Sequence, residues 1–373
     1  MGRKLFQQTI STLVVTAALL GAACGGGTGS QPAGKPATGG APAAPASGQS
    51  GGQAAAPAQA PAQASNACKD RTYKFAYLTL GWAATEIIQQ EKLLENKGWK
   101  IEWSTVGPIS GLVNAFASGQ ADLIDMSVII AGQMYEKDVK LKIFGTAVGV
   151  LGSVVVPTNS TAQTLPDLRG KKVGVIPGGT TTQDINASSR AVYNFDVLRD
   201  TEAITATAPP ELAALIQKGD VEAILIWEPV TSQLVRTGNF RVLVDQQELW
   251  EKASGQPDTE VHVIYLTRPD LAAQCPQLLA DVNASQREAY DIWQNKKDVA
   301  RKAIAEVTQL SPEDVDFAMS RTKQVMYGLT DAQIDTMLKE LKHNRDNGTL
   351  LESNIWNDPA KVKSELFFVP PGR

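Results

Sequence analysis

One unit of helix, glycine and strand occurs twice in this chain, one hundred positions apart. The later copy, residues 209–229, reads PPELAALIQKGDVEAILIWEP. It predicts a short amphipathic helix, a stop at Gly219, and a strand apolar enough to be covered on both faces. The earlier copy, residues 112–124, reads LVNAFASGQADLI, with Gly119 at the matching stop. Two copies of such a unit predict two similar α/β lobes, because a solenoid has shorter and more numerous repeats.

Strand and helix patterns alternate through the folded part, which predicts mostly parallel sheets. The predicted lobes are residues 72–150 together with 262–373, and residues 152–255. Two crossing strands join them. The second crossing, residues 261–266, returns the chain to the first lobe, and the pattern beyond it is helical.

The N-terminus predicts export. Basic residues precede an apolar stretch, residues 10–20, that is too short for a permanent membrane span. Small residues then precede Cys24, as in a bacterial lipobox, so we expect residues 1–23 to be a signal peptide and Cys24 a diacylated N-terminus. An ordinary cleaved signal peptide is the alternative, because Gly21 stands where a lipobox usually has an aliphatic residue.

A tether is expected between the lipid and the folded part, over residues 24–67. After Cys24 it contains only Gly, Ala, Pro, Ser, Thr, Gln and Asn besides the single charge Lys35, so it cannot form a core. Treated as a flexible coil it has a mean reach of roughly 35 Å. We therefore expect a folded protein on the extracytoplasmic side, held to the cell membrane by lipid alone.

The remaining cysteines, Cys68 and Cys275, leave two alternatives open. An exported location permits a disulfide, and two unpaired thiols are equally compatible with the sequence. The chain has no CxxC pair, and His262 and His343 are its only histidines. These counts argue against a zinc site and a histidine-based catalytic triad, and we expect no metal site. The net charge of −4 argues against a nucleic-acid partner.

Ligands of open α/β sheets bind beyond the carboxyl ends of the strands. The positions expected there hold hydroxyls, glycine amides and two Trp rings, without Lys, Arg or His. They are Thr79–Trp82, Pro108–Gly111, Ser127, Gly178–Thr182 and Trp227–Glu228. Amides and hydroxyls at a helix start suit an anion or a carbonyl oxygen, whereas Trp rings suit a flat ring or a cation.

These features together resemble one family, the solute-binding proteins of ABC importers for sulfonates, taurine, nitrate and thiamine precursors. The resemblance rests on the lipobox and tether, the units SGLVNAFASGQADL and PPELAALIQKGDVEAILIWEP, and the LPDLRGKKVGV loop with its GGTTT turn. It covers about residues 72–345. It implies a two-lobed periplasmic-binding-protein fold that closes on a small solute and docks on a permease powered by an ATPase. The family's ligand contacts correspond here to Trp82, Ser110, Ser127, Thr180, Thr181, Trp227 and Glu228.

Each contact has a structural alternative. Trp227 can simply end a strand within the core, and Glu228 can act as the anion at a helix N-cap. Thr180 and its neighbours can be a capping run for the next helix. The glycines before them are no Walker motif, because no GK[ST] follows.

The ligand expected from these residues is a heteroaromatic vitamin. A small dianion would recruit Arg or Lys, which the loop positions lack. Trp82 and Trp227 could stack on a flat ring from opposite lobes, so riboflavin is the first expectation and a thiamine-type pyrimidine the second. A sulfonate-, taurine- or nitrate-type anion is the alternative, since backbone amides alone can hold a monoanion.

A transport receptor is the favoured function class. We expect a monomer with no cofactor and no catalytic residue. An enzyme of the same fold would need His or Cys nucleophiles in the loops, and none occurs there. A sensor ectodomain or adhesive lipoprotein would usually carry extra domains.

Overall fold

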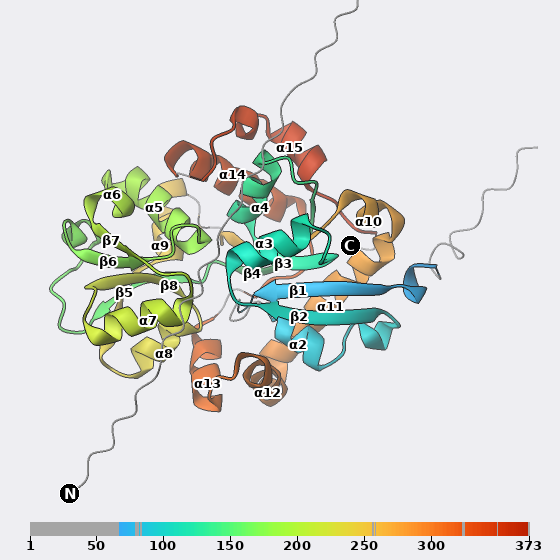
Figure 1. Cartoon of the computed structure of the whole chain (residues 1–373), viewed down its shortest axis with the longest axis horizontal. Helices are drawn as coiled ribbons and strands as arrows, with labels where there is room; N and C mark the ends of the chain where they lie inside the picture. The colour runs from blue at the N-terminus through green and yellow to red at the C-terminus, as the bar shows by residue number, and fades with distance from the viewer. Residues whose placement is uncertain are drawn as a thin grey trace, which may run out of the picture. The chain divides into compact units, whose positions relative to one another are not determined.

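The computed structural model of the chain describes residues 67–78, 82, 84–255, 257, 259–322, 325–348 and 350–371. The predicted signal peptide, the lipidation site Cys24 and almost all of the tether lie outside the described residues. None of the described helices is both long enough and apolar enough to cross a membrane. Two five-stranded sheets organise the described part, one in each predicted lobe (Figure 1).

The first sheet has the strand order β2-β1-β3-β10-β4. Its strands are β1 (Thr72–Leu78), β2 (Lys100–Val106), β3 (Leu123–Ser127), β4 (Lys142–Gly149) and β10 (Val261–Thr267). The pairs β1–β2 and β1–β3 are parallel, and β10 runs antiparallel between β3 and β4. The strand expected to return from the second lobe is therefore an inner strand of the first sheet.

The second sheet repeats this topology, with the order β7-β6-β8-β5-β9. Its strands are β5 (Gly152–Pro157), β6 (Lys172–Val175), β7 (Glu202–Thr205), β8 (Ala223–Trp227) and β9 (Phe240–Asp245). Here β6, β7 and β8 are parallel, and β5 is the antiparallel inner strand. Each lobe thus receives its antiparallel strand directly after the chain has left the other lobe.

Helices cover both faces of the second sheet (Figure 1). One face carries α5 (Thr180–Tyr193), α6 (Val197–Asp200) and α9 (Gln246–Ser254), and the other carries α7 (Pro209–Lys218) and α8 (Val230–Arg236). Alternate residues of β8 enter the two cores, which is why its sequence is apolar throughout.

The first sheet is covered in the same way (Figure 1). On one face lie α2 (Thr85–Gln90), α11 (Pro276–Asn295), α12 (Lys297–Thr308) and α13 (Pro312–Arg321). On the other lie α3 (Ile109–Ala117), α4 (Val128–Glu136), α14 (Asp331–Asn347) and α15 (Pro359–Leu366). The short helix α10 (Pro269–Gln274) connects β10 to α11.

The repeated sequence unit forms the same structure twice, as α3–β3 and α7–β8. Leu112 and Leu212 are both fully buried. Gly119 has φ +76° and Gly219 has φ +77°, a left-handed conformation that favours glycine at a helix end. The repeat therefore marks the corresponding αβ unit of each lobe, as the sequence predicted.

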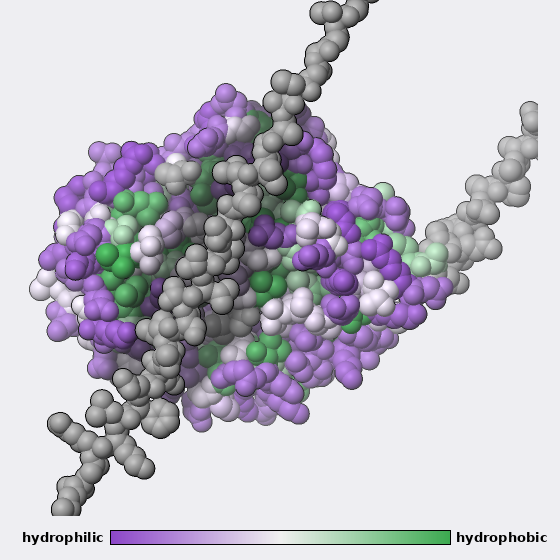
Figure 2. Space-filling view, in the orientation of Figure 1, coloured by the Kyte–Doolittle hydropathy of each residue, from purple (hydrophilic) through white to green (hydrophobic). Residues whose placement is uncertain are grey.

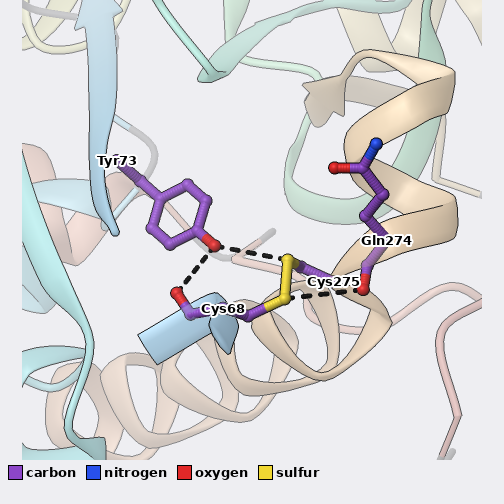
Figure 3. Close-up of a disulfide and its surroundings, with 4 residues drawn as sticks. All are labelled: Cys68, Tyr73, Gln274 and Cys275. Atoms are coloured by element: carbon purple, nitrogen blue, oxygen red, sulfur yellow. Dashed lines mark hydrogen bonds between the residues drawn. A yellow bond between two sulfur atoms is a disulfide. The ribbon is translucent and has the colours of Figure 1, made fainter. Parts of the chain in front are cut away.

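A disulfide joins Cys68 to Cys275, whose Cα atoms are 5.9 Å apart (Figure 3). The Tyr73 hydroxyl lies 2.8 Å from the Cys68 carbonyl oxygen and 3.3 Å from the Cys275 sulfur. The bridge ties the segment before β1 to the start of α11. Both ends of this covalent link therefore lie in the first lobe.

The face shown in Figure 2 is mostly hydrophilic, with apolar residues in small separate areas. Among the described residues, Tyr327 is the only large apolar side chain classed as exposed, at 37%. Scattered apolar residues of this kind are ordinary for a protein surface.

Candidate solute site

A small cavity of about 50 Å³ lies where residues of both sheets meet. Its lining combines polar side chains with a larger set of apolar ones. The polar residues are Asp125, Ser127, Thr180, Thr181 and His262. The apolar residues are Leu78, Ile109, Met126, Leu151, Trp227 and Val263.

The N-termini of three helices meet this cavity. Ile109 is the first residue of α3, Ser127 immediately precedes α4, and Thr180 is the first residue of α5. None of these three helix starts has a side-chain cap. Their first backbone N–H groups are therefore available to an anionic ligand, and the helix dipoles favour negative charge there.

Two hydroxyl groups connect the lobes across the cavity. Ser127 at the end of β3 and Thr180 at the start of α5 form a hydrogen bond. Thr181, beside them, is 2% exposed, and its hydroxyl has no hydrogen-bond partner among the described residues. A buried hydroxyl is normally hydrogen-bonded, so a solute in the cavity would supply the missing partner.

Asp125 is a carboxyl group buried in the middle of β3, with 2% exposure. The Thr85 hydroxyl donates to its Oδ2 at 2.9 Å, and the Leu78 amide approaches its Oδ1 at 3.4 Å. Burial raises the pKa of Asp125 to about 8, and the neighbouring Glu86 carboxylate adds to the rise. The described residues that line the cavity include no Lys or Arg. Asp125 is mostly protonated below pH 8 in the empty protein, and it would ionise to pair with a cationic group of a ligand.

His262 lies on β10 and lines the same cavity. Burial lowers its pKa to about 4, so the ring is neutral at physiological pH. Its Nδ1 has no hydrogen-bond partner among the described residues. This histidine consequently offers hydrogen-bonding capacity without charge.

Four of the seven predicted contact residues lie together in the cavity lining: Ser127, Thr180, Thr181 and Trp227. Ser110 is exposed on the first turn of α3, where its neighbour Ile109 lines the cavity instead. The other two predicted residues, Trp82 and Glu228, are held by contacts elsewhere in the protein.

Trp82 lies in the core of the first lobe and is fully buried. Its indole N–H donates to the Thr322 hydroxyl at 2.7 Å, and its ring packs edge-to-face on Trp293 at a centroid distance of 5.4 Å. The structure does not bring Trp82 to the cavity. An aromatic sandwich with Trp227, expected from the sequence, is therefore not formed here.

Glu228 is paired with protein groups. Its Oε1 accepts a hydrogen bond from Arg321 Nε at 2.9 Å, and its Oε2 accepts one from the Ser232 amide at 3.1 Å. A second ion pair, between Arg236 and Asp314 at 2.6 Å, lies along the same contact of α8 with α13. Glu228 thus accepts a hydrogen bond from the first turn of α8 and forms an ion pair between the two lobes. The first of these roles resembles the helix-capping alternative that the sequence left open.

The sequence interpretation missed Asp125 and His262. Each interrupts an otherwise apolar strand, in Leu-Ile-Asp-Met-Ser and in Val-His-Val-Ile-Tyr-Leu-Thr. An ionisable residue inside such a strand is a signal for a functional site, because its burial is costly unless it is used or paired.

Comparison with known proteins agrees with this architecture. The family model described as the substrate binding domain of ABC-type glycine betaine transport system matches residues 78–315. The taurine-binding periplasmic protein of Escherichia coli (strain K12) is 22% identical over 236 residues, which cover 63% of this chain and 71% of that protein. The crystal structure of the periplasmic aliphatic sulphonate binding protein from Escherichia coli has a TM-score of 0.65 at 18% identity, covering 81% of this chain and 93% of that one. The periplasmic nitrate-binding protein from Synechocystis PCC 6803 has a TM-score of 0.61 at 17% identity, covering 79% and 86%.

Proposed function

We propose a ligand for this chain from the premise that it belongs to the family of substrate-binding domains of ABC-type glycine betaine transport systems. As such it is the solute-binding protein of an ABC importer, working outside the cytoplasm and delivering a small ligand to the permease. Its relatives are binding proteins, not enzymes. The ligand that we propose is a small aminosulfonate of the taurine type, a zwitterion.

The anionic end of such a solute suits the helix starts. Hydroxyls of Ser127, Thr180 and Thr181, together with the backbone amides of α4 and α5, form a donor-rich, uncharged surface. Uncharged donors can hold a monoanion such as a sulfonate without a Lys or Arg. The relatives named for taurine and for aliphatic sulphonates support this end of the proposal.

Asp125 is the single observation that carries the proposal of a zwitterion. A simple alkanesulfonate offers this buried carboxyl no opposite charge and keeps it protonated, whereas an ammonium group would pair with its ionised form. Because the lining includes both anion-binding helix starts and this carboxyl, a ligand with both charges matches it best.

Riboflavin, the first expectation from the sequence, is replaced by the sulfonate alternative. The relatives of this chain are named for taurine and aliphatic sulphonates, and Trp82 is packed in the core instead of facing a ring. Trp227 remains beside the cavity, where its ring can cover the short carbon chain of an aminosulfonate.

Isothermal titration of the purified protein tests this assignment. We expect taurine to bind with a lower Kd than ethanesulfonate, nitrate, glycine betaine or riboflavin. Ethanesulfonate is the matched control, because it has the same sulfonate and carbon chain without the ammonium group. Equal or tighter binding of ethanesulfonate would contradict the role of Asp125, and binding of riboflavin alone would restore the vitamin interpretation.

The pH dependence of binding gives a second prediction. Asp125 in the empty protein has a pKa raised to about 8, and a bound ammonium would lower it. Taurine binding then releases a proton below pH 8, so its affinity should fall as pH decreases from about 8 to 6, by at most about tenfold per pH unit. A bound ethanesulfonate would raise the same pKa, so its affinity should be constant below pH 8 and fall above it. Similar profiles for the two solutes would contradict the proposal.

Other groups near Asp125 do not reverse these signs. Burial raises the pKa of Glu86 to about 7, and its ionisation also favours a cationic ligand. His262, with a pKa of about 4, stays neutral over this range. Burial raises the pKa of Tyr77 and of Tyr265, so both phenols stay protonated as well.

We also propose the lipid anchor and the lobe boundaries expected from the sequence. The lobes, residues 72–150 with 262–373 and residues 152–255, would close on the solute about the two crossings, in the manner of two-lobed binding proteins. The boundary at residue 150 lies between β4 and β5, which belong to different sheets.

A Cys24→Ala variant tests the anchor. We expect it to leave the membrane fraction, because the lipid at this cysteine is the proposed attachment. Cys275→Ala is a matched control that should stay with the membrane. Membrane association of the Cys24→Ala variant that survives a high-salt wash would contradict the lipobox.

A further inference from the structure

Three buried carboxyl groups lie together outside the solute cavity. Asp184 comes from α5 of the second lobe, Glu340 from α14 of the first, and Glu260 from the crossing that leads into β10. Their exposed fractions are 1%, 0% and 1%. One oxygen atom from each lies within 4.8 Å of the others.

Hydrogen-bond donors of the protein reach only some of the oxygens of these three carboxyl groups. Asn344 Nδ2 donates to Asp184 Oδ1 at 2.9 Å, and Gln246 Nε2 donates to Asp184 Oδ2 at 3.1 Å and to Glu260 Oε2 at 3.3 Å. The ion pairs of the described residues bring no Lys or Arg to any of the three carboxyl groups. Both oxygens of Glu340 and Oε1 of Glu260 have no hydrogen-bond partner within the described part of the chain.

A fourth buried group points to a ligand independently of the carboxyls. His262 is 8% exposed, and its unpartnered Nδ1 lies 3.8 Å from Asp184 Oδ2. Burial keeps this ring neutral, so its attraction to the carboxylate is not that of an ion pair. A neutral imidazole nitrogen at the edge of a carboxylate cluster is placed to hold a water molecule bound to a metal ion.

We propose that Asp184, Glu260 and Glu340 bind one divalent cation that prefers oxygen ligands, of the size of Ca²⁺ or Mn²⁺. Two oxygens that share a Ca²⁺ ion at 2.3–2.6 Å are at most about 5 Å apart, and the three carboxyl oxygens, all within 4.8 Å of one another, meet this condition.

The electrostatics of the cluster support a cation. All three side chains are almost fully buried, and no Lys or Arg of the described residues pairs with them. The cluster must therefore either hold protons or share a cation, because three buried negative charges without compensation are very costly.

The position of the site suggests what the cation does. It would link α5 of the second lobe to α14 of the first at the crossing where the Glu260 carbonyl accepts a hydrogen bond from the Val150 amide. His262 borders both this cluster and the solute cavity. The cation therefore stabilises the junction of the lobes beside the solute, and is separate from the solute itself.

Electron paramagnetic resonance of Mn²⁺ added to the purified full chain tests this site directly. We expect loss of the free Mn²⁺ signal with a stoichiometry of one ion per chain and a Kd below about 1 mM, and Ca²⁺ should displace the bound Mn²⁺. Ca²⁺ should also raise the melting temperature of the protein. Absence of Mn²⁺ binding up to about 1 mM would overturn the proposal. So would a site that binds added Zn²⁺ and does not release it when Ca²⁺ is added.

Variants assign the binding to these residues. Glu340→Gln and Asp184→Asn should each weaken Mn²⁺ binding at least tenfold, while Glu222→Gln, an exposed glutamate on the second lobe, should leave it unchanged. A melting curve of each variant checks that it is folded. If the first two variants do not fold, displacement of Mn²⁺ by Ca²⁺ from the wild-type chain still decides whether an oxygen-ligand site exists. Unchanged Mn²⁺ binding in folded Glu340→Gln would overturn the assignment, and none of these results depends on taurine.

Discussion

Asp125→Asn should weaken taurine binding by about 10- to 100-fold and leave ethanesulfonate binding unchanged or stronger. A hydrogen bond to a charged group contributes about 1.5–3 kcal/mol, and each 1.4 kcal/mol corresponds to tenfold in Kd. The amide keeps the size of the side chain, removes its charge, and retains one of its two acceptor oxygens for the hydrogen bond from Thr85. Titration calorimetry of both solutes at pH 8, where Asp125 is half ionised in the empty protein, measures the difference.

The fold should tolerate this substitution. The pKa of Asp125 in the folded chain is raised to about 8 from an ordinary value of 3.8. Its burial therefore lowers the free energy of unfolding, and this loss becomes larger as pH rises from about 4 to 8. A neutral Asn avoids this cost, and the melting temperature at pH 8 should not decrease.

Asp122→Asn is the matched control, in the turn that leads into β3 but outside the cavity lining. It removes the charge that pairs with Arg71 at 2.6 Å and with Arg268 at 2.8 Å, so it should cost stability and leave the Kd for taurine within about twofold. Equal losses of taurine affinity in the two variants would show that Asp125 acts through the fold, and its proposed contact with the ammonium group would be wrong.

Replacing both Cys68 and Cys275 by Ser should lower the free energy of unfolding by about 2–5 kcal/mol. The disulfide closes a loop with a sequence separation of 207 residues, and long loops lose the most entropy when they are closed. Urea denaturation of wild-type and variant proteins measures the change. We expect the folded variant to bind taurine as the wild type does, because neither cysteine lines the cavity.

The reducing agent dithiothreitol provides the control. It should destabilise the wild type to the level of the double variant and have no effect on the variant itself. Thiol labelling of the unreduced, unfolded wild type should leave Cys68 and Cys275 unmodified, and labelling of both would contradict the bridge.

Much of the fold was predictable because the relevant signals are local. The helix–glycine–strand repeat contains its own periodicity and its own stop, and Gly119 and Gly219 both take the left-handed conformation it predicts. The strand predicted at residues 261–266 is β10, which spans Val261–Thr267.

The site was less predictable, because it depends on which side chains face inward after the lobes pack. Ser127 and Thr180 could be found as residues next to helix starts. Trp82 also follows a predicted strand, yet its ring lies in the core. There it contacts Thr322 and Trp293, which both come from the far C-terminal part of the first lobe. No local pattern contains that contact. The ion pair of Glu228 with Arg321 could not be predicted either, because the two residues are far apart in the sequence.

The place of β10 has a consequence for how the chain matures during export. All strands of the second sheet come from one continuous segment, from β5 to β9, whereas the first sheet lacks an inner strand until β10 has left the translocation channel. Cys275, the partner of Cys68, emerges later still. The second lobe can thus fold before the first lobe has its last strand. Until β10 is added, β1 to β4 have unpaired strand edges, which can aggregate. In chains arrested at increasing lengths, this order predicts that the second lobe becomes resistant to protease before the first. The disulfide between Cys68 and Cys275 should form last.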